Sequence, residues 1–229
     1  RETVLNLSGW RERGFYGRGY RVKQDISAGD LMARLHKTLD HEVEVLEHQF
    51  HRNAVRTVRG TGKFLDPHAV EIALEDGSRR TCTADFILLA CGTHPFRPDY
   101  VPFNDCNVFD GDQILDLPAL PRSLTVIGAG VIGVEYATIF SALDVAVTLV
   151  EPRDSFLDFI DREIMQEFVH ELRDRNVRLS LGTAVGEIVV EDGRPVCRMA
   201  DGRAIVSEML LFAAGRVGAV EHLDLAAAG

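Results

Sequence analysis

The sequence predicts an α/β protein whose later half carries a parallel sheet. Apolar segments 124–127 and 145–150 flank a helical segment, 131–142, in the order of a right-handed βαβ crossover. The run Gly-Ala-Gly-Val-Ile-Gly, residues 128–133, separates the first strand from the helix. Two Asp-Gly dipeptides divide the alternating residues 187–206, which predicts an antiparallel β-meander inserted into this second domain.

The spacing of the three glycines predicts a dinucleotide site. Gly128 permits a tight turn, Gly130 lets the backbone approach a pyrophosphate, and Gly133 lets the helix pack closely on the sheet. The phosphates would then face a helix N-terminus. The alternative is a purely structural turn, which the flanking strand and helix disfavour. The expected contacts are Gly128, Gly130, Val131, Ile132 and Gly133.

Two charged residues near the end of the second strand bear on nucleotide choice. Glu151 follows Gly128 by 23 positions, where a carboxylate can accept the adenosine ribose hydroxyls of NAD(H). Arg153 could meet the 2′-phosphate of NADP(H), or it could be a solvated surface charge. Gly215 and Arg216 follow the apolar strand 209–212, at a strand end where ligands of open α/β sheets bind.

A long amphipathic helix is predicted in the first half of the chain. Ser27 and Asp30 form a capping-box pattern, and apolar residues recur every three or four positions to about residue 53. His48 and His51 on this helix have a spacing that could suit a metal, but no third ligand converges in the sequence, so no metal site is expected.

Other elements follow from shorter patterns. Asp161 should cap a second helix in the later half. A hairpin turn is expected at Asp76-Gly77, and segment 105–115 is expected to return to the first domain. The unbroken apolar run 86–90 predicts a strand covered on both faces. The remaining expected strands are 54–58, 70–74 and 177–181.

Composition excludes several classes of function. The chain has 229 residues and a formal net charge of −10, which argues against nonspecific binding to nucleic acid or anionic membranes. No apolar run approaches the roughly 20 residues of a membrane span, and no signal peptide opens the chain. The four cysteines form no CxxC or metal-ligand pattern. A cytoplasmic protein with reduced thiols is expected.

Four segments together resemble a known family, the flavin-dependent pyridine nucleotide-disulfide oxidoreductases. They are residues 86–95, 109–115, 121–140 and 212–216. The resemblance extends over essentially the whole chain and implies two Rossmann-like domains: an incomplete FAD-binding domain at 1–118 and an NAD(P)-binding domain at 119–229. It also implies that the family's first glycine motif lies upstream of Arg1, and that a C-terminal domain, which forms a homodimer, lies beyond Gly229.

The same resemblance assigns roles to individual residues. Gly60 and Gly62 match a loop whose backbone touches the FAD adenine. Ala90, Gly92 and Thr93 match a turn against the ADP half of FAD. Within this turn, Cys91 stands where the family commonly has threonine. Glu135 matches a glutamate near the nicotinamide and flavin, which makes it the candidate catalytic residue. Its alternative role is to complement the positive helix N-terminus.

The implied activity is hydride transfer between NADPH/NADP and NADH/NAD, with FAD carrying the hydride. The implied partners are therefore nicotinamide dinucleotides, and this chain alone is expected to be inactive. Two alternatives remain open from the sequence. One is a disulfide reductase like lipoamide dehydrogenase, and the other is a noncatalytic NAD(P)-binding fragment.

Overall fold

A computed structural model describes residues 2–17, 19–23 and 25–229. By their internal contacts, these residues fall into two compact units, which are described separately. Unit 1 comprises Arg1–Lys37 with Pro95–Gly215, and unit 2 comprises Thr38–His94 with Arg216–Gly229. The division of the protein into an FAD domain at 1–118 and an NAD(P) domain at 119–229 remains a prediction.

Unit 1 is built on a five-stranded sheet in which every neighbouring pair is parallel. The parallel sheet predicted for the later half is thus confirmed. Segment 105–115 was expected in the first domain, but its strand β5 (Val108–Asp110) pairs with β12 (Met209–Phe212), so that expectation was wrong. In spatial order the strands are β5 (Val108–Asp110), β12 (Met209–Phe212), β6 (Ser123–Ile127), β7 (Ala146–Glu151) and β8 (Arg178–Leu181).

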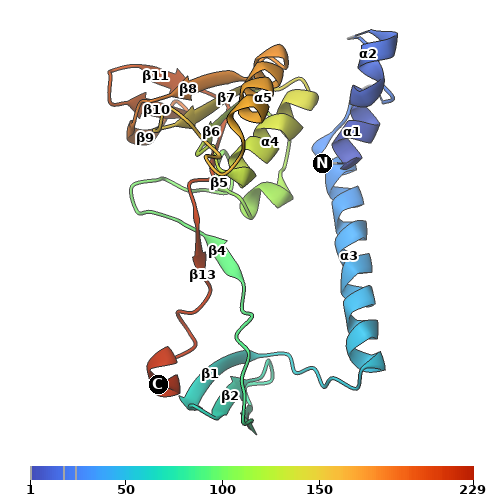
Figure 1. Cartoon of the computed structure of the whole chain (residues 1–229), viewed down its shortest axis with the longest axis vertical. Coiled ribbons are helices and arrows are strands. Elements are labelled where there is room, and N and C mark those ends of the chain that lie inside the picture. The colour runs from blue at the N-terminus through green and yellow to red at the C-terminus, as the bar shows by residue number, and fades with distance from the viewer. Residues whose placement is uncertain (1, 18, 24) are drawn as a thin grey trace. The chain divides into compact units, whose positions relative to one another are not determined.

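Both faces of this sheet are covered, which explains its continuous apolar strands. Helices α4 (Val131–Ala142) and α5 (Arg162–Asp174) pack on one face, where alternate residues such as Leu149 and Leu211 enter a common core. Their neighbours Val150 and Leu210 point to the other face, against the β-meander. Figure 1 shows the two helices and the meander on opposite sides of the sheet.

The meander and the second helix form as their turn and cap residues predict. The meander is antiparallel, with strands β9 (Val185–Glu191), β10 (Arg194–Met199) and β11 (Ala204–Val206). At the start of α5, the Asp161 carboxylate accepts a hydrogen bond from the Glu163 backbone N–H at 2.9 Å. This contact satisfies one of the N–H groups that a helix leaves unpaired at its N-terminus.

The N-terminal part of unit 1 consists of α1 (Glu2–Ser8), a 3₁₀ turn (Trp10–Glu12) and α2 (Arg13–Tyr16). Val4 of α1 packs against Ala142 at the end of α4. The guanidinium groups of Arg13 and Arg175 lie 4.8 and 4.4 Å from the centre of the Trp10 ring. These cation–π contacts and the small apolar cluster attach the N-terminal helices to the α4 and α5 side of unit 1.

The predicted long helix is α3 (Ala28–Arg52), which runs from unit 1 into unit 2. Its capping box is reciprocal: the Asp30 backbone N–H donates to Ser27 Oγ, and the Ser27 backbone N–H donates to Asp30 Oδ2. Only Ala28 and Leu31 of this helix are buried. From Leu39 onward the apolar residues of its stripe, among them Val43 and Phe50, are exposed.

Unit 2 contains two small sheets. The first is antiparallel, with β1 (Thr61–Asp66), β2 (Ala69–Ala73) and β3 (Arg79–Thr83), and β2 and β3 are joined by the predicted turn at Asp76-Gly77. The second sheet pairs β4 (Thr93–Pro95) with β13 (Arg216–Gly218). Short 3₁₀ turns lie at Gln113–Asp116 in unit 1 and Leu225–Ala228 in unit 2.

Two strand predictions were wrong. Segments 54–58 and 86–90 form no strand, and within the described residues neither pairs with a neighbour. A strand needs a partner for its backbone N–H and C=O groups, which an apolar sequence pattern cannot supply. The side chains of Phe86 and Leu88 are 94% and 90% exposed instead of buried. Strand β1 was not predicted, because Gly60 and Gly62 made that segment resemble a loop.

Candidate dinucleotide-binding site

The predicted site lies where the parallel strands of unit 1 end. Because all five strands run in the same direction, their carboxyl ends meet at one edge of the sheet. Asp110, Gly128 and Glu151 end or follow β5, β6 and β7 at this edge. Figure 1 shows α4 beginning directly after β6. Open α/β sheets bind their ligands outside this edge, next to the first turn of such a helix.

Gly128 occupies a position that only glycine fits. Its φ of +97° lies in the region that residues with side chains rarely adopt. A Cβ atom there would stand 2.8 Å from the carbonyl oxygen of Ala213, which follows β12. The Gly128 N–H donates to the Val150 carbonyl at 2.8 Å, which fixes the turn on the neighbouring strand β7. The tight turn assigned to Gly128 is therefore present.

The other two glycines differ in what surrounds them. A Cβ atom on Gly133 would stand 1.8 Å from the Gly128 carbonyl oxygen, so α4 can pack this closely only with glycine there. Gly130 precedes the first residue of α4, with φ of −70°, and a Cβ atom on it would meet no atom of the described chain within 4 Å. The start of α4 thus has open space beside Gly130, as a bound pyrophosphate would require.

The Glu151 side chain stabilises the glycine turn by hydrogen bonding. Its side chain is 7% exposed. Its Oε2 accepts the Ala129 backbone N–H at 2.9 Å, and its Oε1 accepts Arg153 Nε at 2.8 Å. Burial disfavours the charged form of Glu151, but the hydrogen bonds from Arg153 and Ala129 outweigh it and lower the pKa of this carboxyl. Glu151 is therefore a carboxylate at neutral pH, next to the loop that would hold the pyrophosphate.

One structural contributor to this edge was not predicted. The Asp110 carboxylate is buried at the end of β5, accepts the backbone N–H groups of Asp112 and Gln113, and lies 3.2 Å from Arg97 Nη1. The turn that it stabilises contacts α4, because Tyr136 donates from its hydroxyl to the Gly111 carbonyl at 3.3 Å. The Asp-Gly-Asp sequence after a short apolar segment was the available signal for such a turn.

The remaining predicted residues of unit 1 lie around the same region. Val131 and Glu135 are exposed in the first two turns of α4, and Ile132 between them is half-buried. Gly215 has a φ of +136°, and its carbonyl accepts the Phe96 backbone N–H at 3.1 Å. The roles of these residues in binding or catalysis remain predictions.

The residues expected to contact FAD lie mainly in unit 2. Gly60 precedes β1, and a Cβ atom on it would stand 2.5 Å from the Ala73 carbonyl oxygen, so packing inside the small sheet already requires glycine. Gly62 lies within β1, opposite Ile72. Ala90 and Gly92 are exposed in an extended segment, where Gly92 has φ of +72°.

Thr93 and Arg216 are brought together by the pairing of β4 with β13. Arg216 donates from Nε to Thr93 Oγ1 and from Nη2 to the Thr93 carbonyl, both at 2.7 Å. The structure therefore gives Arg216 a structural role that the sequence did not reveal.

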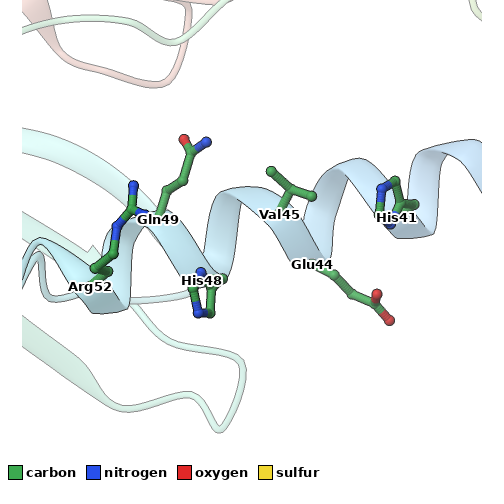
Figure 2. A pocket seen from close by; sticks show the side chains of 6 residues that line it. All are labelled: His41, Glu44, Val45, His48, Gln49 and Arg52. Atoms are coloured by element: carbon green, nitrogen blue, oxygen red, sulfur yellow. The ribbon is translucent and has the colours of Figure 1, made fainter.

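A separate hollow lies on the exposed part of α3 and contains none of the predicted nucleotide-binding residues. Figure 2 shows that its side chains are spread along the helix and that Glu44 and Gln49 point in opposite directions. Among the described residues, no three His, Cys, Asp or Glu side chains are grouped closely enough to hold a metal ion. The lining residues are His41, Glu44, Val45, His48, Gln49 and Arg52.

The parallel sheet and the glycine turn between β6 and α4 define the class of Rossmann-type α/β proteins. Residues 11–229 match the sequence profile of a family described as pyridine nucleotide-disulphide oxidoreductase. The chain belongs to this family. Within the described residues, no helix is both long enough and apolar enough to span a bilayer.

Curated relatives agree with this assignment. All of this chain aligns with 49% of a soluble pyridine nucleotide transhydrogenase of Mycobacterium tuberculosis, at 45% identity over 232 residues. A protein of the same name from Colwellia psychrerythraea is 31% identical over 229 residues, which cover 100% of this chain and 49% of that protein. Another from Pseudomonas aeruginosa is 34% identical over 200 residues, which cover 87% of this chain and 43% of that protein. The chain thus spans about half the length of the curated relatives it matches.

Solved structures share the fold. LpdA of Mycobacterium tuberculosis superposes with a TM-score of 0.88 at 24% identity, over 100% of this chain and 51% of its own. A cysteine-to-serine mutant of the flavoprotein disulfide reductase RclA of Escherichia coli gives a TM-score of 0.79 at 22% identity, over 99% of this chain and 49% of its own. At these identities the likeness concerns the fold.

Proposed function

We propose that this chain forms the NAD(P)-binding part and a portion of the FAD-binding part of an enzyme that transfers hydride between NADPH/NADP and NADH/NAD. The observation that carries the proposal is the open start of α4 at Gly130, next to a turn that Gly128 and Gly133 make possible. The name shared by the relatives from three genera, soluble pyridine nucleotide transhydrogenase, supports the reaction class.

The residues at the sheet edge fit a dinucleotide. In the proposed complex, the pyrophosphate lies against the backbone at Gly130 and the first turn of α4, and Glu151 accepts the adenosine ribose hydroxyls. A carboxylate has about four acceptor positions, so the three hydrogen bonds that Glu151 accepts, from the Ala129 N–H and from the backbone N–H and Nε of Arg153, leave capacity for a ribose hydroxyl. Glu135, exposed in the first turns of α4, is the proposed catalytic residue near the nicotinamide.

The fit to FAD is partial. Gly92, with its open surroundings and positive φ, suits a close approach of the cofactor to the backbone, and Ala90 and Thr93 flank it. At Gly60, the close approach of the Ala73 backbone already explains why glycine is needed, without a contact to FAD. When bound, FAD would supply the hydride-carrying chemistry. The homodimer, the cytoplasmic location and the division into an FAD-binding part and an NAD(P)-binding part belong to the same proposal.

The test is to assay the natural gene product that contains this chain for its flavin and its reaction. We expect a yellow protein in which NADPH reduces an NAD analogue without any disulfide substrate. NADH-dependent reduction of lipoamide or another disulfide, without transfer between nucleotides, would favour the disulfide-reductase alternative. A colourless protein that binds nucleotides without turnover would favour the binding module.

A further inference from the structure

Arg153 is held between two carboxylates in the loop that follows β7. Its Nε donates to Glu151 Oε1 at 2.8 Å, and its Nη1 lies 3.5 Å from Asp158 Oδ2. The side chains of Arg153 and Asp158 are both 58% exposed, whereas Glu151 is buried. The guanidinium is therefore fixed by the sheet edge on one side and by a surface carboxylate on the other.

The loop itself fixes the position of Asp158. Phe156 and Leu157 are buried in the core between the sheet and its helices, and Leu157 has a φ of +54°, which residues with bulky side chains rarely adopt. Exposed Ser155 and Asp158 flank this buried pair, and Ser155 Oγ donates to Asp158 Oδ1 at 2.7 Å. The Asp158 carboxylate is thus anchored on one oxygen and faces Arg153 with the other.

We infer that Asp158 is a specificity-determining residue that engages Arg153 and so favours dinucleotides with a free 2′-hydroxyl over those with a 2′-phosphate. The inference rests on the proposed function, because it places the adenosine ribose at Glu151. A 2′-phosphate would need the guanidinium N–H groups that Asp158 now attracts.

The effect should be moderate, because exposed ion pairs are weak and are screened by salt. Asp158→Asn keeps the size of the side chain and removes its charge. In the purified chain, we expect the NADPH affinity to rise about two- to fivefold at low ionic strength while the NADH affinity changes by less than about 1.5-fold. The gain for NADPH should shrink at high ionic strength. Ser155→Ala, which releases the anchor of Asp158, should give a smaller gain in the same direction.

Two further variants identify the route of the effect. Asp154→Asn removes the same charge from the same loop at a residue with no described bond to Arg153, and it should leave the NADPH/NADH affinity ratio nearly unchanged. In an Arg153→Ala background, Asp158→Asn should lose most of its effect, because Asp158 acts through Arg153. An equal gain in that background would overturn this role and indicate direct repulsion of the phosphate.

Fluorescence titration of NADH and NADPH separates this inference from the proposed function. NADH binding by the wild-type chain, combined with a raised NADPH/NADH affinity ratio in Asp158→Asn, supports the inference. NADH binding with an unchanged ratio overturns the inference alone. If the wild-type chain binds neither nucleotide, the dinucleotide site and the inference fail together.

Discussion

At the scale of single residues, Glu151 has a structural task as well as its proposed ligand task. The sequence indicated a ribose acceptor, and the structure adds bonds to the Ala129 N–H and to Arg153. Removing such a charged acceptor leaves the buried Ala129 N–H unpaired, which typically costs about 1–3 kcal/mol. A loss of NADH binding in a Glu151 variant would therefore mix a missing ribose contact with a disordered glycine turn.

A stability measurement separates the structural task. Because the pKa of Glu151 is lowered in the folded chain, its carboxylate stabilises the fold at pH values above the ordinary glutamate pKa of 4.5. That contribution should decrease as the pH falls from 4.5 through the lower, folded-state pKa. We expect Glu151→Gln to reduce the free energy of unfolding by about 1–3 kcal/mol at pH 7, with a smaller difference at acidic pH.

Urea unfolding of wild type and variant at several pH values measures this difference. Glu167→Gln is the control, because Glu167 is exposed in the middle of α5 and its loss should change stability by less than about 0.5 kcal/mol. A Glu151→Gln effect that is independent of pH would show that its ionised form is not what stabilises the turn.

At the scale of elements, two helical glycines should respond in opposite ways to the same substitution. Gly133→Ala places a methyl group against the Gly128 carbonyl oxygen, so α4 must shift, and we expect a loss of about 1–3 kcal/mol. Gly29→Ala in α3 meets only Ser27 Oγ, at 3.7 Å, and should be neutral or stabilising by up to about 1 kcal/mol, because alanine favours helix. Thermal unfolding of both variants checks the pair, and equal shifts in Tm would count against the close packing of α4.

The elements also show what the sequence could and could not reveal. The βαβ unit, the meander and the Asp161 cap were predicted because their signals are local: periodicity, Asp-Gly turns and a capping side chain. Segment 86–90 has the apolar pattern of a buried strand, but no partner strand lies beside it in the described residues. Strand β1 was missed for the opposite reason. Its glycines disfavour a strand in the sequence, but its pairing with β2 stabilises one in the structure.

The site also combines features that local sequence patterns predict with features that they do not. The three glycines and Glu151 follow a known spacing, so the sequence placed them correctly at one sheet edge. The contact between Arg153 and Asp158 depends on the unusual backbone of Leu157 and on the burial of Phe156, which no local pattern encodes. Arg216 was assigned to a ligand-binding turn, whereas its bonds to Thr93 join two strands that are far apart in the sequence.

At the scale of the whole molecule, we expect the chain to bind NAD(H) but to retain little FAD. Phe86 and Leu88 are almost fully exposed, and the neighbouring Ala90–Gly92 segment is exposed and forms no strand, although the Gly92 carbonyl accepts the Ala219 backbone N–H at 3.0 Å. We therefore expect the chain, purified with added FAD, to retain little flavin and to show no transfer from NADPH to an NAD analogue. The visible absorbance spectrum measures this directly, and one bound flavin per chain would refute the prediction.

The central claim is that the glycine turn at the edge of the five-stranded sheet binds NAD(H). Gly130→Val tests it by filling the open space at the start of α4 with a branched side chain. Gly14→Val is the matched control, because Gly14 also has open surroundings but lies in α2. Circular dichroism should show that both variants are folded.

Titration of NADH against the wild-type chain and these two variants is the most direct measurement. We predict saturable binding to the wild type and to Gly14→Val, with a loss of about tenfold or more in Gly130→Val, equivalent to at least about 1.4 kcal/mol. Equal NADH affinity in the wild type and in folded Gly130→Val would contradict the account.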